Sequence, residues 1–150
     1  MNKILWYADT RAYLYFGKAI TGSKYVKKQF GPVPREIAGV LSELSDEGAI
    51  VARDGQLYFY PQRQFISVID PDISTFTAKE ISLVDKLIEI ICESHTAQSI
   101  SDLTHDDIWE MAEIGEEIPY CTIYAAKRGD VCEDDMSWAL NAARKLGIAN

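Results

Sequence analysis

The sequence contains few of the residues that most often build a catalytic or metal centre. Its 150 residues include only two histidines and three cysteines. Cys92, Cys121 and Cys132 cannot all pair within the chain, and their spacing matches no zinc motif, so we expect reduced thiols. Cys92 and His95 would share one helix face, but a metal site needs three or four ligands. We therefore expect neither a metal site nor a cofactor.

The motifs of common catalytic centres are also missing. The sequence has no G-x-S-x-G, no H-E-x-x-H and no phosphate-binding glycine motif. Its carboxylate pairs, such as Asp106-Asp107, are sequence neighbours whose side chains would point in different directions on a helix. His105 is a candidate general base, but a histidine at the start of a helix more often serves a structural role. The sequence thus predicts a protein that is not an enzyme.

Long apolar runs are absent as well. No stretch approaches the roughly 20 apolar residues that a membrane span requires. Near the N-terminus, Asp9 and Arg11 interrupt the apolar run that a signal peptide would need. Together with reduced cysteines, these absences predict a cytoplasmic protein with no membrane partner. The length and the hydrophobic content of 47% predict a single domain with one core.

The net charge of −8 is unevenly distributed along the chain. Residues 1–70 carry nine lysines and arginines against seven acidic residues, whereas residues 71–150 carry six against sixteen. An acidic C-terminal half repels nucleic-acid phosphates and speeds the encounter with basic partners. The simpler interpretation, in which the acidic surface only keeps the protein soluble, stays open.

Apolar residues at helical spacing predict a largely helical chain. Gly17 and Gly48 would end the first two helices. Thr77 and Glu80 fit a capping box at the start of the third, whose broad apolar stripe predicts a central core helix. The predicted helices cover residues 3–17, 34–47, 77–93 and 133–146, with short helices at 99–102 and near 106–114.

Between the helices the sequence favours extended structure. Residues 22–30 read as a short extended piece, and Gly31-Pro32-Val33-Pro34 predicts a rigid turn because proline fixes φ. Residues 49–53 and 56–60 predict a β-hairpin closed by Asp54-Gly55, a pair that a type I′ turn favours. Pro61 would end the hairpin, and residues 65–69 would form a further strand or an extended connection. These elements predict an α+β fold, a mostly helical single domain with a small antiparallel β-hairpin or sheet.

A helix followed by a hairpin is also the order of a winged-helix recognition helix and its wing. Lys24, Lys27 and Lys28 lie just upstream of this helix and would favour DNA. The helix itself carries acidic residues such as Glu43 and Glu47, which phosphates would repel. A DNA-binding autoregulator is therefore the alternative function, and nucleic acid is the less favoured partner.

Three short motifs occur in a specific order along the chain. Tyr7-Ala8-Asp9 lies in the first predicted helix, Phe30-Gly31-Pro32-Val33 precedes the second, and Leu103-Thr104-His105 with Trp109 follows the long helix. In this order they resemble the Panacea domain, the family of SocA-like antitoxins that prophages often carry. The likeness runs from residue 3 to about 130. We expect residues 1–150 to be one such domain, starting without the N-terminal stretch that members commonly have.

The resemblance implies a cytoplasmic antitoxin that neutralises a cognate toxin by direct binding, and at least one family member also delivers its toxin to a protease as an adaptor. The uneven charge adds the prediction that the toxin surface is basic, and a homo-oligomer stays open. Asp9 is placed to accept hydrogen bonds, while Thr104 and His105 could cap the helix of Trp109. The motif residues, structural or partner-binding, are Tyr7, Asp9, Phe30, Gly31, Pro32, Val33, Leu103, Thr104, His105 and Trp109.

Overall fold

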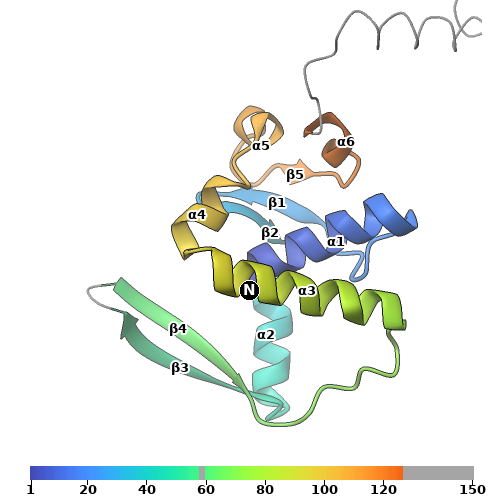
Figure 1. The fold of residues 1–150 in the computed structure, drawn as a ribbon. Coiled ribbons are helices and arrows are strands. Elements are labelled where there is room, and N and C mark those ends of the chain that lie inside the picture. The colour runs from blue at the N-terminus through green and yellow to red at the C-terminus, as the bar shows by residue number, and fades with distance from the viewer. Residues whose placement is uncertain (58–59, 127–150) are drawn as a thin grey trace, which may run out of the picture.

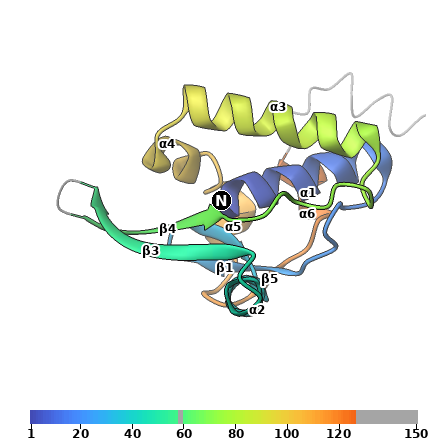
Figure 2. The same ribbon diagram turned by 90° about the horizontal axis from the view of Figure 1, so that it is seen from below.

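The computed structural model describes residues 1–57 and 60–126, and it has the predicted α+β class. In Figures 1 and 2, helix α1 (Asn2–Phe16) lies between a three-stranded sheet and helix α3 (Ala78–Ser94). No helix of the described residues is both long and apolar enough to span a bilayer. The helix predicted over residues 133–146 lies outside the described residues.

The ends of α1 and α3 follow the sequence signals. Gly17 ends α1 in the left-handed region at φ 76°, and its N–H donates to the Tyr13 carbonyl. At the start of α3, the Thr77 hydroxyl accepts from the Glu80 N–H at 3.3 Å, while the Glu80 carboxylate accepts from the Thr77 N–H at 2.8 Å. A cap of this kind contributes about 1 kcal/mol. The predicted capping box is therefore confirmed.

Helix α3 is less buried than its apolar stripe predicts. Only Glu80 and Ile91 of its seventeen residues are buried, and Ile88 and Ile90 are exposed. The helix packs chiefly against α1 and runs in the opposite direction. Helix α1 therefore covers only one side of the broad apolar stripe of α3. The prediction of a central core helix is wrong for the described part of the chain.

The main sheet has the strand order β2-β1-β5 and is antiparallel throughout. Its central strand β1 is Tyr25–Lys28, and its edges are β2 (Gly31–Pro34) and β5 (Glu117–Ile118). The prediction of a rigid turn over residues 31–34 is wrong, because the turn lies at residues 29–30 and residues 31–34 pair with β1. Strand β2 is an edge strand, where prolines are tolerated because fewer backbone donors are needed.

Helix α2 (Ile37–Asp46) and the hairpin of β3 (Ile50–Leu57) and β4 (Tyr60–Ser67) form a second part of the fold. The helix begins three residues later than predicted, because Pro34 belongs to β2. Figure 1 shows the hairpin extending away from the main body.

The hairpin is confirmed, but its predicted turn is wrong. Asp54 and Gly55 lie inside β3, opposite Arg63 and Gln62, and Pro61 lies inside β4 instead of ending it. The pairing of Val51 with Ile66, in a register that extends from Ile50 to Leu57, outweighs the local preference of Asp-Gly for a tight turn.

Three short helices complete the described chain: α4 (Ala97–Asp102), α5 (Asp107–Met111) and α6 (Thr122–Ala126). The core lies where α1 meets the sheet and consists of Trp6, Tyr25 and Ile118. The rings of Trp6 and Tyr25 meet edge to face with centroids 5.0 Å apart. The core thus joins the first helix to a strand more than 100 residues later in the chain.

Candidate functional site

Two of the family-like motifs meet where the β1–β2 turn touches the end of α4. The carbonyl oxygen of Phe30 accepts hydrogen bonds from the Lys3 ammonium and from the Ser101 hydroxyl, the latter at 2.7 Å. Gly31 follows at φ +109°, and a Cβ there would collide with the Lys3 ammonium and the Thr104 hydroxyl. Only glycine fits this position, since the backbone angle and the space both exclude a side chain.

The Leu103-Thr104 backbone is held from two sides. The Thr104 hydroxyl is buried and donates to the Ser101 carbonyl at 2.7 Å. The Tyr7 hydroxyl donates to the Leu103 carbonyl at 3.3 Å, which ties α1 to the end of α4. Burial raises the pKa of Tyr7, although the nearby Arg11 opposes this shift. Tyr7 and Thr104 therefore act as framework of this corner.

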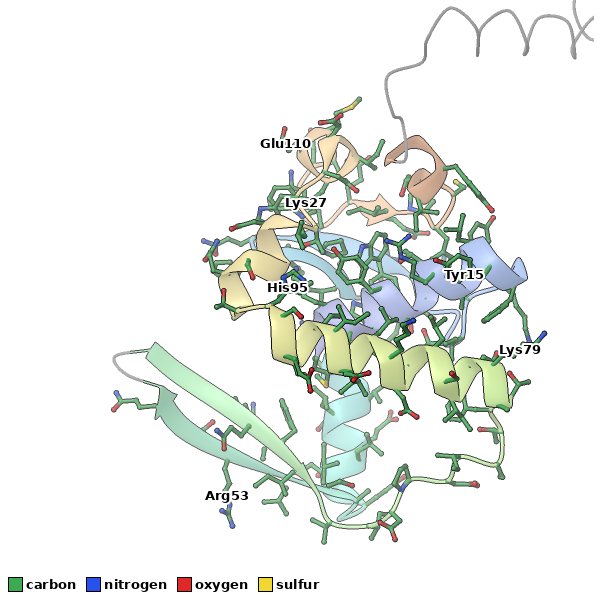
Figure 3. The ribbon with its side chains drawn as sticks, in the orientation of Figure 1. Tyr15, Lys27, Arg53, Lys79, His95 and Glu110 are labelled. Atoms are coloured by element: carbon green, nitrogen blue, oxygen red, sulfur yellow. The ribbon has the colours of Figure 1, made fainter. Side chains whose placement is uncertain are left out.

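His105, Trp109 and Lys27 form a stack beside this corner. The ring of His105 lies parallel to the Trp109 ring with centroids 3.7 Å apart, and the Lys27 ammonium lies 4.1 Å from the Trp109 ring centroid. Lys27 also donates to the carbonyls of Glu110 and Ala112, at 3.2 and 2.9 Å. Figure 3 shows Lys27 below Glu110, between β1 and α5. The lysine satisfies two α5 carbonyl groups and fixes the tryptophan through a cation–π contact.

The expected capping role of Thr104 and His105 is wrong. The cap of α5 is Asp106, whose carboxylate accepts from the Trp109 N–H at 2.9 Å. Asp106 precedes the helix directly, which is the position from which a side chain reaches the N3 amide. The buried Nε2 atom of His105 has no hydrogen-bond partner within residues 1–57 and 60–126.

Asp9 lies apart from this corner, on the side of α1 that faces the 17–25 loop. Its carboxylate is fully buried and accepts from the Thr21 N–H at 2.7 Å, from the Thr21 hydroxyl and from the Tyr25 hydroxyl at 2.8 Å. The expected acceptor role of Asp9 agrees with this geometry. Burial, followed by the Asp9 charge, raises the pKa of Tyr25 and raises that of Tyr120 to about 12. Asp9 therefore anchors the loop and the first strand to α1.

The motif residues divide by exposure. Pro32 is fully buried opposite Lys27 in the sheet, and Val33 pairs with Val26. By contrast, the side chains of Phe30 and Leu103 are 66% and 59% exposed. The buried members can only support the fold, whereas these two apolar side chains are available to a partner.

Sequence reasoning missed several residues that hold the motif residues in place, namely Lys3, Lys27 and Ser101 at this corner and Thr21 and Tyr25 around Asp9. Their contacts join residues 12 to 85 positions apart, and no local pattern encodes such pairs. Strand β1 is buried at three successive positions in the structure, and the buried lysine therefore needs partners, but the sequence alone does not reveal this burial.

The chain from Asp102 onward carries several exposed acidic and apolar side chains, Leu103 among them. We define the α4–α5 surface as residues 102–116, where Met111 is 82% exposed and Ile114 is also exposed. Figure 3 shows Glu110 of this surface directed outward at the end of the molecule. The exposed carboxylates of the surface are Asp102, Asp107, Glu110, Glu113 and Glu116.

The described residues thus form a small α+β domain with a rigid internal corner and an acidic, partly apolar outer surface. They contain no group of three or more His, Cys, Asp or Glu residues arranged to hold a metal ion. The family model described as "Antitoxin SocA-like, Panacea domain" matches residues 1–110, and the chain belongs to this family. Neither the curated proteins nor the solved structures gave a match.

Proposed function

We propose that the protein is an antitoxin that neutralises a cognate toxin by binding it directly through the α4–α5 surface. Membership of the SocA-like family supports the antitoxin role and a toxin partner in general. The observation that carries the proposed surface is the exposure of Leu103, Met111 and Ile114 among carboxylates. Apolar side chains at the centre of a charged rim are the usual anchors of a protein interface.

The charge of this surface supports a basic toxin. Its five exposed carboxylates lie in the half of the chain that carries sixteen acidic residues and six basic ones. Charge of one sign speeds the encounter with a partner of the opposite sign, and salt screens this attraction beyond about 10 Å. The association rate with the toxin should therefore fall as the salt concentration is raised from 50 to about 500 mM.

The test is to search for a small reading frame beside the coding gene that is toxic when expressed alone, and to co-express it with this protein. The wild-type protein should restore growth and bind the purified toxin, whereas Leu103→Ser should weaken binding by roughly ten- to hundredfold. Ile69→Ser is the matched control, because Ile69 is 60% exposed and lies outside the surface. Equal toxin affinity of both variants would reject the α4–α5 surface, and failure of the wild type to bind or protect would reject the antitoxin role.

Delivery of the toxin to a protease, the adaptor role of at least one family member, would add degradation to binding. The two are separated by the toxin half-life in cells: an adaptor shortens the half-life, and an inhibitor that only binds leaves it unchanged or longer. DNA binding is less favoured, because the last turn of α2 and its C-cap carry the exposed residues Glu43, Asp46 and Glu47 before the hairpin.

A further inference from the structure

An apolar groove runs between helices α1 and α3. Its volume of about 740 Å³ lies within the range of roughly 300–1,000 Å³ that is usual for small-molecule pockets. Figure 3 labels two of its lining residues, Tyr15 and His95, toward opposite ends of α1. Its apolar lining includes Leu83, Leu87 and Ile90 of α3, Ile100 of α4 and Ile123 of α6.

The apolar lining is elongated. Leu83, Leu87 and Ile90 recur at intervals of four and three residues, which places them in one row along α3. From Leu83 to Ile90 the helix rises about 10 Å. Ile100 and Leu103 continue the lining at the α4 end. An unbranched apolar chain fits such a row better than a compact ring system does.

Two cations line this groove, in a protein whose net charge is −8. Arg11 is half-buried on α1, and Lys86 directly precedes Leu87 on α3. Neither forms an ion pair within residues 1–57 and 60–126. A half-buried guanidinium beside apolar side chains is partly desolvated, and an anionic partner restores the lost stabilisation.

Asp106 is the carboxylate among the described lining residues, and it already has a partner. It caps α5 by accepting from the Trp109 N–H at 2.9 Å. Asp106 and Arg11 both lie near Tyr7, but no ion pair joins them in the described part of the chain. The lining therefore has more positive than negative charge, with Arg11 and Lys86 against one carboxylate.

We propose that this groove binds an amphipathic carboxylate with an unbranched acyl chain. The ligand's carboxylate lies between Arg11 and Lys86, and its chain extends over Leu87 toward Ile100. The orientation follows from Asp106, which repels a carboxylate at the α4 end. The inference concerns the free protein and does not depend on the toxin.

Titration calorimetry of the full-length protein with decanoate, below the concentration at which it forms micelles, tests the site. Decanoate should bind at a single site. Octanoate should bind about fifteenfold more weakly, because each buried methylene changes the affinity about fourfold. Arg11→Gln and Lys86→Gln should each lower the affinity for decanoate about three- to tenfold. Neither should change the affinity for decanol, which has the same chain without the charge.

Ile90→Glu and Ile88→Glu are the matched pair for the apolar lining. The two side chains are 43% and 42% exposed on the same helix, but only Ile90 lines the groove. Ile90→Glu should weaken decanoate binding at least tenfold, whereas Ile88→Glu should bind decanoate as the wild type does. Both variants should keep the helix content of the wild type by circular dichroism, because both positions are exposed.

Four results would overturn the proposal. The first is a wild-type protein without saturable decanoate binding, and the second is equal affinity of the Ile90 and Ile88 variants. The third is a decanoate affinity that neither Arg11→Gln nor Lys86→Gln lowers, since the groove would then not recognise the carboxylate. The fourth is sedimentation of the protein with phosphatidylglycerol vesicles that dissolved decanoate does not reduce, which would show a membrane surface instead.

Discussion

Substitution of Gly31 by alanine should destabilise the protein more than any other single-methyl change at a described glycine. Two effects add at this position. The backbone φ of +109° is one that alanine adopts only at a cost of about 1–3 kcal/mol. In addition, the new Cβ would collide with the Lys3 ammonium and the Thr104 hydroxyl. Lysine can swing away, but Thr104 is buried and hydrogen-bonded to Ser101.

The expected net loss for Gly31→Ala is about 2–4 kcal/mol. Overpacking against Thr104 costs about 1–3 kcal/mol. The lower entropy of alanine in the unfolded chain returns only about 0.4–1 kcal/mol. For a protein of this size, the loss corresponds to a fall in Tm of roughly 5–15 °C. Urea unfolding followed by tryptophan fluorescence measures it directly.

Gly22→Ala is the matched control, because Gly22 has φ +68° and no atom within 4 Å of the added Cβ. It should cost about 1 kcal/mol, from backbone strain alone. The double variant Gly31→Ala/Thr104→Ala should recover about 1 kcal/mol relative to the sum of the single changes, because the colliding hydroxyl is removed. If Gly31→Ala were no more destabilising than Gly22→Ala, the argument from the close approach would be refuted.

Three further predictions concern the buried polar groups. Asp9→Asn should cost about 2–4 kcal/mol in urea unfolding, because an amide nitrogen in place of one carboxylate oxygen cannot accept the hydrogen bonds that the Thr21 and Tyr25 hydroxyls donate there. Lys27→Met should cost about 1–3 kcal/mol and alter Trp109 fluorescence, since it removes a cation–π contact and two hydrogen bonds to carbonyls. Burial lowers the pKa of Lys3 from 10.5 to about 8, so the unfolded chain holds that proton more tightly. The stability of the wild type relative to Lys3→Met should therefore rise between about pH 8 and 10, by roughly 1 kcal/mol because the ammonium is only partly buried.

The sequence predicts those parts of the fold in which neighbouring residues alone determine the structure. The left-handed Gly17 and the Thr77–Glu80 box act within one helical turn, and both helix ends are where the sequence indicates. The Asp54-Gly55 pair is an equally strong local signal for a tight turn, yet the chain does not turn there. Its strands are long enough to pair in a more extended register, and the sum of the cross-strand contacts exceeds one turn preference.

At the candidate site, too, the sequence predicts only what neighbouring residues determine. The sequence motifs identify Gly31, Thr104 and Trp109, but the partners that explain them are Lys3, Ser101 and Lys27. These partners reach the motif residues only after the sheet and α1 have assembled. A buried lysine on a ring face, or a hydroxyl that bonds a turn carbonyl, depends on tertiary geometry and leaves no periodic pattern.

The match to the family model ends at residue 110, but the fold does not. Strand β5 lies beyond that point, and its Ile118 completes the core with Trp6 and Tyr25. Backbone hydrogen bonds join the Lys27 N–H to the Glu116 carbonyl at 2.8 Å and the Gly115 N–H to the Lys27 carbonyl at 2.9 Å. Since the same lysine fixes Trp109, the residues after 110 hold the motif corner in place. The stability of the family motifs in this chain therefore depends on a segment that lies beyond the matched residues.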